Sequence, residues 1–211
     1  MNVDFSTCDL CDAQRADTGG NFRVIAPVFK DFGGVKKFCG PVETVKCFED
    51  NSLVKAAVDS PGWLETSAGR VAKVLVVDGG GSLRKALLGG NLAAAASRNG
   101  WAGVVVDGGV RDIKEVRSLG FPIYGRSVVP SSTVSRYAGV SRNVPVQCGG
   151  VEVKPGDIIV ADEDGVVRVP QARAAEVLQR AREIDERETK MLPFIRQHKA
   201  LSKAVSVFNR I

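Results

Sequence analysis

The chain is poor in aromatic residues, has a single histidine and contains no long hydrophobic run. Only 6% of its 211 residues are aromatic, and its formal net charge is +5. Surfaces that bind nucleic acid usually carry a dense Lys/Arg patch or aromatic residues among basic ones, so we expect no direct nucleic-acid binding. No apolar run approaches the roughly 20 residues that span a bilayer, and residues 1–7 have no secretory signal pattern. We therefore expect a cytoplasmic protein without a membrane segment.

Clustered metal ligands are also scarce. The five cysteines include one C-x-x-C pair, Cys8 and Cys11, but the other three supply no second pair. The one histidine, His198, lies far away near the C-terminus. This pattern favours small apolar residues of a first helix over a zinc or redox site, and it is typical of a reducing compartment.

The length and the order of patterns predict an α/β domain over residues 1–170 and a helical extension over 171–211. Within the extension, Gln171 to Met191 has apolar residues at helical spacing, and Pro193 predicts a break before a second apolar stripe. We expect this extension to serve packing or oligomer contact.

In the middle of the domain, predicted strands alternate with predicted helices, and both flanks consist mostly of short strands. Strands are predicted at residues 23–29, 38–48, 74–77, 104–106, 122–125, 144–147, 151–153, 157–161 and 166–169, the last two forming a hairpin. Helices are predicted at about 7–15, 51–58, 83–88, 92–98 and 113–119, and a loop at 62–69. Buried strands separated by helices predict parallel crossovers.

The most informative segment runs from Val104 to Asp112, where an apolar strand enters a glycine turn and ends in Arg111 and Asp112. A guanidinium there can hold an anionic substrate, and a carboxylate can anchor hydrated magnesium. The alternative interpretation is an ordinary surface ion pair.

Two glycine stretches precede this pair. Residues 78–84 lack the Lys-Ser/Thr ending of a P-loop and have Arg84 where a dinucleotide fingerprint needs its third glycine, so nucleotide binding is not expected. Residues 89–92 (Gly-Gly-Asn-Leu) lead into a helix, whose first N–H groups suit a carboxylate. Because residues 89–92 and the Arg111–Asp112 pair each follow a parallel strand, we expect them at the same edge of the sheet. A plain helix–helix turn is the alternative interpretation of residues 89–92.

Three central blocks carry a family resemblance. They are FCGPVETVKCFED (38–50), VVDGGGSLRKALLGGNL (76–92) and NGWAGVVVDGGVRD (99–112). Together with segments at both ends, they make residues 5–170 resemble the family of the regulator of ribonuclease activity A and the class II 4-hydroxy-4-methyl-2-oxoglutarate aldolases. The resemblance implies a layered α/β/α sandwich of the swivelling, phosphohistidine-domain type. It also implies a homotrimer or hexamer with its pocket at a subunit boundary.

The resemblance also implies a site. In the aldolase branch a 2-oxo acid binds a divalent metal, most commonly magnesium and in some cases manganese, and carbon–carbon cleavage leaves a metal-stabilised pyruvate enolate. Transferred by position, Gly89, Gly90, Asn91 and Leu92 contact the substrate through their backbone. Arg111 binds the substrate as the catalytic residue. Asp112 binds the metal, largely through water.

One position departs from the aldolase pattern. Aldolases carry an acidic residue twenty-one positions before the arginine, where this chain has Gly90. The bacterial regulator branch also lacks that acid and acts by binding ribonuclease E and related RNA-processing machinery, yet it often lacks the carboxylate that Asp112 retains. Two hypotheses follow. The first, favoured as the physiological role, is a protein regulator of ribonuclease activity. The second is a magnesium-dependent lyase that forms pyruvate by aldol cleavage or oxaloacetate decarboxylation. One pocket and one partner-binding surface can coexist.

Overall fold

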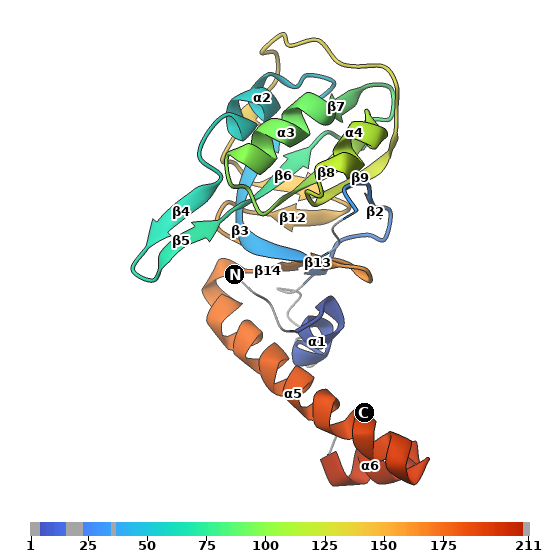
Figure 1. The fold of residues 1–211 in the computed structure, drawn as a ribbon. Coiled ribbons are helices and arrows are strands. Elements are labelled where there is room, and N and C mark those ends of the chain that lie inside the picture. The colour runs from blue at the N-terminus through green and yellow to red at the C-terminus, as the bar shows by residue number, and fades with distance from the viewer. Residues whose placement is uncertain (1–4, 16–22, 35–36, 209–211) are drawn as a thin grey trace.

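A computed structural model describes residues 5–15, 23–34 and 37–208. The last three residues of the expected extension, 209–211, therefore lie outside the described part. The mixed α/β class predicted from the sequence is confirmed, with a curled sheet and helices packed on it (Figure 1). Within the described residues, no helix combines the length and apolar character needed to cross a membrane.

Four parallel strands form the centre of a ten-stranded sheet. They lie in the order β3 (Phe38–Lys46), β6 (Val74–Asp78), β8 (Gly103–Val110) and β9 (Ile123–Val128). Every residue of β6 and β8 is buried. Strands covered on both faces need near-continuous apolar sequence, which is why the valine runs of β6 and β8 predict strands.

Antiparallel strands extend the sheet on both sides. The first half of β3 pairs with β13 (Ile158–Asp162) and its second half with β6, so β3 joins the parallel and antiparallel parts. The remaining sheet strands are β14 (Gly165–Val169) beside β13, β1 (Arg23–Val24) beside β14, β2 (Lys30–Asp31) beside β9, β10 (Ser141–Arg142) beside β3, and β7 (Ala86–Leu88) beside β8.

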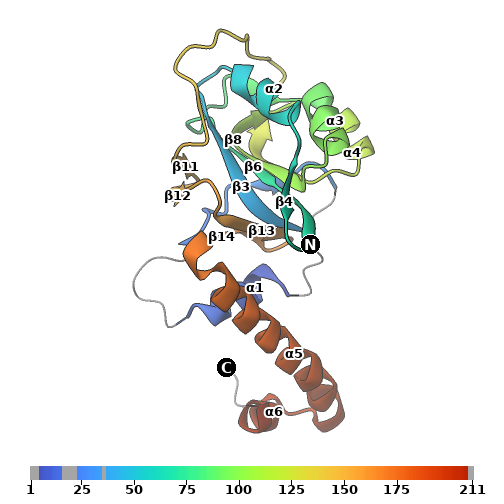
Figure 2. The same cartoon turned by 90° about the vertical axis from the view of Figure 1, so that its left-hand side faces the viewer.

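Different elements cover the two faces of the parallel strands. Helices α2 (Ser52–Val58), α3 (Gly90–Arg98) and α4 (Ile113–Ser118) lie on one face, over a core that includes Leu75 and Val104 (Figures 1 and 2). The other face packs on the hairpin β11 (Val146–Cys148) and β12 (Val151–Val153).

Helices from the N-terminal and C-terminal parts of the chain, α1 and α5, pack together below the sheet (Figure 1). Helix α1 (Thr7–Ala13) begins with a capping box between Ser6 and Asp9. After a short 3₁₀ turn, η1 (Gln171–Arg173), helix α5 (Ala174–His198) packs its first half on α1, β13 and β14. Its second half projects from the body, and α6 (Leu201–Phe208) folds against it (Figures 1 and 2).

Five local predictions are wrong. The strand predicted at residues 23–29 forms only at Arg23–Val24, and residues 27–28 are a turn. Residues 83–88 are not helical, because Ala86–Leu88 pair with β8 as β7. Residues 62–69 are not a loop: they contribute to a hairpin of β4 (Trp63–Thr66) and β5 (Gly69–Ala72). The predicted glycine turn after Val106 belongs to β8, which continues to Val110. Pro193 does not break α5, which ends only where Lys199 adopts a left-handed conformation.

Candidate functional site

The loop at residues 89–92 and the loop that begins at Arg111 lie at the same edge of the sheet, as the sequence predicted. Strand β7 runs parallel to the end of β8, with Leu88 beside Val110. The Arg111 N–H donates to the Leu88 carbonyl at 3.0 Å. The residue after each strand therefore enters the same space. The alternative helix–helix turn at residues 89–92 is excluded, because a strand precedes it.

The carboxylate of Asp112 contacts the N-terminus of α3. Gly89 is the N-cap residue and has no side chain to cap the helix. Instead, the Gly90 N–H donates to Asp112 Oδ2 at 3.1 Å. An anion at a helix N-terminus is favoured by the unpaired N–H groups and the helix dipole. Asp112 thus fixes one end of the site to α3.

Asp112 has an unusual backbone conformation. Its φ is 57°, a left-handed conformation that is uncommon for residues other than glycine. Although Asp112 is the N-cap of α4, its side chain does not cap that helix. Arg111 Nε lies 3.4 Å from Asp112 Oδ2, and both side chains are 39% exposed. Both charged groups therefore face accessible space.

The two glycines are required for this close packing. A Cβ atom at Gly89 would lie 2.5 Å from Asp112 Oδ2 and 3.0 Å from Arg111 Cγ. A Cβ atom at Gly90 would lie 2.9 Å from the Cβ of Glu115 on α4. Cβ atoms essentially never approach other atoms closer than 3.0 Å, so α3 and α4 would have to move apart to accommodate a side chain at position 90.

A cavity of about 310 Å³ opens at this edge. Five of the six predicted site residues line it, and Gly90 does not. Residues of α2 and of the loop after β9, which no sequence motif indicated, complete its wall. The polar members of its wall are Asn51, Lys55, Asn91, Arg111, Asp112, Ser132 and Thr133.

The loop after β9 is held firmly against the start of α2. Asp50 accepts hydrogen bonds from the Arg136 N–H at 2.9 Å, the Ala138 N–H at 3.3 Å and Ser52. Burial alone would raise the pKa of Asp50, but these hydrogen bonds outweigh it and lower the pKa to about 2. Thr133 donates to the Glu49 carbonyl. The cavity wall on this side is therefore preorganised.

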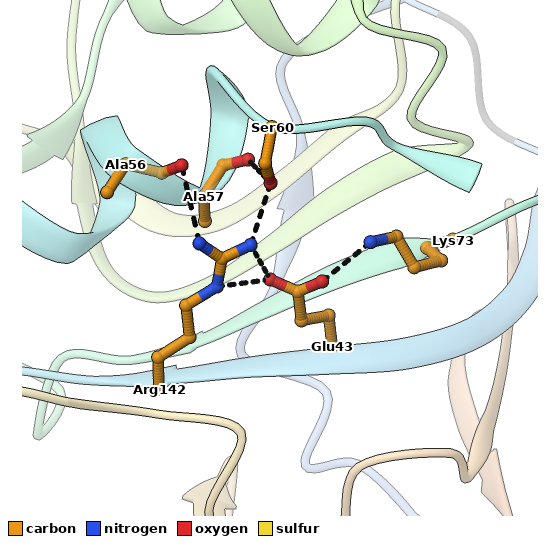
Figure 3. A network of polar contacts seen from close by, with 6 residues as sticks. All are labelled: Glu43, Ala56, Ala57, Ser60, Lys73 and Arg142. Atoms are coloured by element: carbon orange, nitrogen blue, oxygen red, sulfur yellow. Dashed lines mark hydrogen bonds and ion pairs between the residues drawn. The ribbon is translucent and has the colours of Figure 1, made fainter. Parts of the chain in front are cut away.

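A buried ionic network supports the far end of α2 (Figure 3). Glu43 of β3 pairs with Lys73 at 2.6 Å and with Arg142 of β10 at 2.5 Å. Arg142 also donates to the Ser60 hydroxyl at 2.7 Å and to the Ala56 carbonyl. Lys73 lies over the ring of Trp101. These contacts fix α2, and with it Asn51 and Lys55, to the sheet.

The donor set of the cavity fits a magnesium ion held largely by water. Of the described residues on its wall, Asp112 is the one that carries a carboxylate. Among the described residues, no group of three or more His, Cys, Asp or Glu side chains could enclose a metal. Magnesium commonly uses one or two carboxylates and keeps several waters, unlike structural zinc, which needs four protein ligands.

Cys8 and Cys11 lie on α1, the first helix that the sequence predicted. All five cysteines are free. Burial and the neighbouring Asp164 carboxylate raise the pKa of Cys8 to about 11, and burial raises that of Cys11. Thiols that stay protonated at neutral pH are poor nucleophiles.

Known proteins share this arrangement of elements. The RraA-like family, described as Aldolase/RraA, matches residues 7–168. The chain belongs to the RraA-like family. A relative from Albidiferax ferrireducens, provisionally named 4-hydroxy-4-methyl-2-oxoglutarate aldolase, is 63% identical over 167 residues, which are 79% of this chain and 96% of that relative. The family resemblance of the three central blocks is thereby confirmed.

Two solved structures extend the comparison. The RNA-processing inhibitor RraA from Thermus thermophilis is 41% identical with a TM-score of 0.69, over 79% of this chain and 93% of that one. An uncharacterised protein from Pseudomonas syringae is 26% identical with a TM-score of 0.80, over 96% of this chain and 90% of that one. The second alignment is long enough to include most of the helical extension, which lies outside the RraA-like match.

Proposed function

We propose that this protein is a magnesium-dependent carbon–carbon lyase that acts on small 2-oxo acids and forms pyruvate. Oxaloacetate is its preferred substrate. The observation that carries the proposal is the convergence of the α3 N-terminus, Arg111 and Asp112, joined by the 3.1 Å hydrogen bond from Gly90 to Asp112. The name of the 63% identical relative supports the same class of reaction.

Arg111 and α3 bind and orient the substrate. The guanidinium holds the planar 2-oxo carboxylate, and the N–H groups of Asn91 and Leu92 at the helix start add backbone donors. In oxaloacetate the C3–C4 bond then breaks and C4 leaves as carbon dioxide. The electrons of that bond form a C2–C3 double bond, and the C2 oxygen becomes negatively charged. A proton from solvent then adds to C3 and gives pyruvate. Arg111 stabilises the negative charge that develops on that oxygen.

Asp112 would hold the metal, magnesium or manganese, through its carboxylate and through bound water. When bound, the ion acts as a Lewis acid that polarises the 2-oxo group.

Glycine at position 90 favours decarboxylation over aldol cleavage. Aldol cleavage of 4-hydroxy-4-methyl-2-oxoglutarate needs a base to remove the proton of the C4 hydroxyl, whereas loss of carbon dioxide needs none. Gly90 supplies no carboxylate, and the Glu115 Cβ fills the space where its side chain would begin. Oxaloacetate should therefore be turned over faster than the hydroxymethyl acid.

A pyruvate-release assay tests the proposal. Purified protein with magnesium should release pyruvate from oxaloacetate above the metal-catalysed background, and Asp112→Ala should abolish the excess. Equal rates for the two proteins would overturn the assignment of the pocket. So would an absence of turnover with both oxaloacetate and the hydroxymethyl acid.

A second candidate function is regulation of an RNA-degrading ribonuclease through the protein surface. It is favoured by the 41% identity to a structure described as an RNA-processing inhibitor. We expect that the protein would co-purify with a ribonuclease complex and slow its cleavage of RNA. Failure of Asp112→Ala to change this inhibition would separate it from the pocket chemistry.

The assembly belongs to the same proposal. We propose a cytoplasmic homotrimer or hexamer of swivelling-type α/β/α domains formed by residues 1–170, in which residues 171–211 make intersubunit contacts. The projecting half of α5 supports this role for the extension. A mass measurement in solution, with and without residues 171–211, tests it: an unchanged oligomer after truncation would contradict it.

A further inference from the structure

We infer that Lys55 binds the distal carboxylate of a dicarboxylic 2-oxo acid, so that the cavity selects dicarboxylic over monocarboxylic substrates. The inference rests on the proposed function, because it takes Arg111 as the group that holds the carboxylate next to the 2-oxo carbon. It assigns a role to the α2 side of the cavity. The roles proposed for the glycine loop and for the Arg111–Asp112 pair leave that side without one.

Lys55 reaches the cavity from a fixed position. It lies four residues after Asn51, the N-cap of α2, so both project from the same side of the helix, and both line the cavity. Its ammonium donates to the Ser135 hydroxyl at 2.7 Å. That hydroxyl donates to Asn51 Oδ1 at 3.1 Å. The hydrogen bond from the neighbouring Arg136 N–H to Asp50 anchors this segment to the start of α2.

The Lys55 ammonium has capacity for a ligand. No described carboxylate forms an ion pair with it, and Ser135 uses one of its three protons. The side-chain oxygen of Asn51 accepts from Ser135, and its side-chain nitrogen donates to no described protein group. Two strong donors are therefore available on the α2 side of the cavity.

The charge distribution of the cavity suits an anion with two charged ends. Lys55 and Arg111 each contribute a positive charge, and Asp112 contributes the one negative charge among the described residues of the wall. Arg111 and Asp112 follow β8, whereas Lys55 lies on α2, so the cationic groups enter from different elements. A cavity of about 310 Å³ has room for a four- or five-carbon diacid.

A matched pair of ligands isolates the distal carboxylate. 2-Oxoglutarate and 2-oxovalerate have five carbons each and differ in a carboxylate at the far end. Calorimetric titration with magnesium should show that the wild-type protein binds 2-oxoglutarate about tenfold more tightly, the size of one charge-assisted hydrogen bond. In Lys55→Met, binding of 2-oxoglutarate should weaken about tenfold, while that of 2-oxovalerate stays within about twofold.

Two control variants complete the test. Lys55→Arg should keep the preference, because a guanidinium also binds carboxylate. Lys114→Met removes an exposed lysine of α4 that does not line the cavity, and should change neither affinity. Equal weakening of both ligands in Lys55→Met, unchanged affinities, or no preference in the wild-type protein would each overturn the inference.

Kinetics with oxaloacetate give an independent readout. The distal carboxylate loses its charge as it becomes carbon dioxide, so Lys55 stabilises the bound substrate more than the transition state. Lys55→Met should therefore raise KM while kcat stays constant or rises, whereas misfolding would lower kcat.

The two proposals fail separately. If Lys55→Met abolishes the preference for 2-oxoglutarate but the wild-type protein releases no pyruvate, the diacid site stands and the lyase does not. If oxaloacetate is cleaved and Lys55→Met leaves both KM and the ligand preference unchanged, the lyase stands and the Lys55 inference is wrong.

Discussion

Replacement of Asp112 by asparagine separates the chemistry of the site from the stability of the fold. Asparagine has nearly the same shape and, after glycine, is among the residues best suited to the left-handed conformation at this position, where φ is 57°. Its side-chain oxygen can still accept the hydrogen bond from the Gly90 N–H, which measures 3.1 Å in the wild-type protein. The substitution therefore removes one negative charge and little else.

The expected stability change is small. A hydrogen bond to a charged acceptor contributes about 1.5–3 kcal/mol and one to a neutral acceptor about 0.5–1.5 kcal/mol. The Asp112 side chain is 39% exposed, so the lower values apply. Asp112→Asn should thus lower the free energy of unfolding by about 1 kcal/mol, or Tm by about 2–4 °C.

The expected functional change is much larger. With the carboxylate of Asp112 on the cavity wall neutralised, magnesium loses its anionic ligand. We expect kcat/KM for oxaloacetate to fall at least about 100-fold, equivalent to about 2.7 kcal/mol of transition-state stabilisation. Manganese affinity, measured by electron paramagnetic resonance, should fall at least about tenfold.

Asp59→Asn is the matched control, since Asp59 is exposed at the end of α2 and does not line the cavity. It should leave kcat/KM and manganese affinity unchanged. The reasoning is refuted if Asp112→Asn retains wild-type turnover and manganese binding. It is also refuted if Asp112→Asn loses activity only in proportion to a large loss of stability.

Three further predictions concern stability and the missing acid. Glu43→Leu should cost about 3 kcal/mol in urea unfolding, because it leaves the buried Lys73 and the partly exposed Arg142 without their carboxylate. Arg142→Ala, which preserves one ion pair of Glu43, should cost less. The lowered pKa of Asp50 means that the unfolded chain takes up a proton at higher pH than the folded protein does. The stabilisation is therefore complete above about pH 4 and is lost toward pH 2. The urea midpoint should fall across that range, and Asp50→Asn should flatten the fall. Gly90→Asp should destabilise the fold, because its Cβ meets that of Glu115 at 2.9 Å. Adding Glu115→Gly removes that contact, at a cost of about 1 kcal/mol for glycine within α4, and should raise aldol cleavage relative to decarboxylation. An aldol rate that stays unchanged in this double variant would contradict the role assigned to position 90.

The central strands and helices were predictable because their signals are local. The valine runs of β6 and β8 are apolar along their whole length, and α2 and α4 have helical periodicity close to their observed bounds. The sequence placed Gly89 and Arg111 at one edge by the rule that parallel strands end on the same side, but the strand that brings Gly89 there is β7, for which the sequence predicted a helix.

The errors arose where distant partners decide the local structure. Residues Ala86–Leu88 are as compatible with a helix as with a strand, and pairing with β8 settles the choice. Gly109 lies in β8, not in a turn, and the Val129 side chain packs 2.8 Å from the position that a Cβ atom would take there. Pro193 stays within α5, next to Phe194, whose ring packs on Phe208 of α6.

The missed half of the cavity has the same cause. Asn51 and Lys55 follow immediately after the block that resembles the family, but nothing in their spacing connects them with the glycine loop that begins at Gly89. Only the packing of α2 on the sheet, fixed by Glu43 and Arg142, brings them opposite the end of β8.

A crystal structure with manganese and oxalate tests the central claim most directly. Oxalate has the planar geometry of the pyruvate enolate, and the anomalous scattering of manganese locates the metal. We expect oxalate between Arg111 and the N–H groups at the start of α3, with the metal on the Asp112 side of the cavity. Metal and oxalate bound elsewhere, or clear density for an empty cavity at saturating concentrations of both, would contradict it.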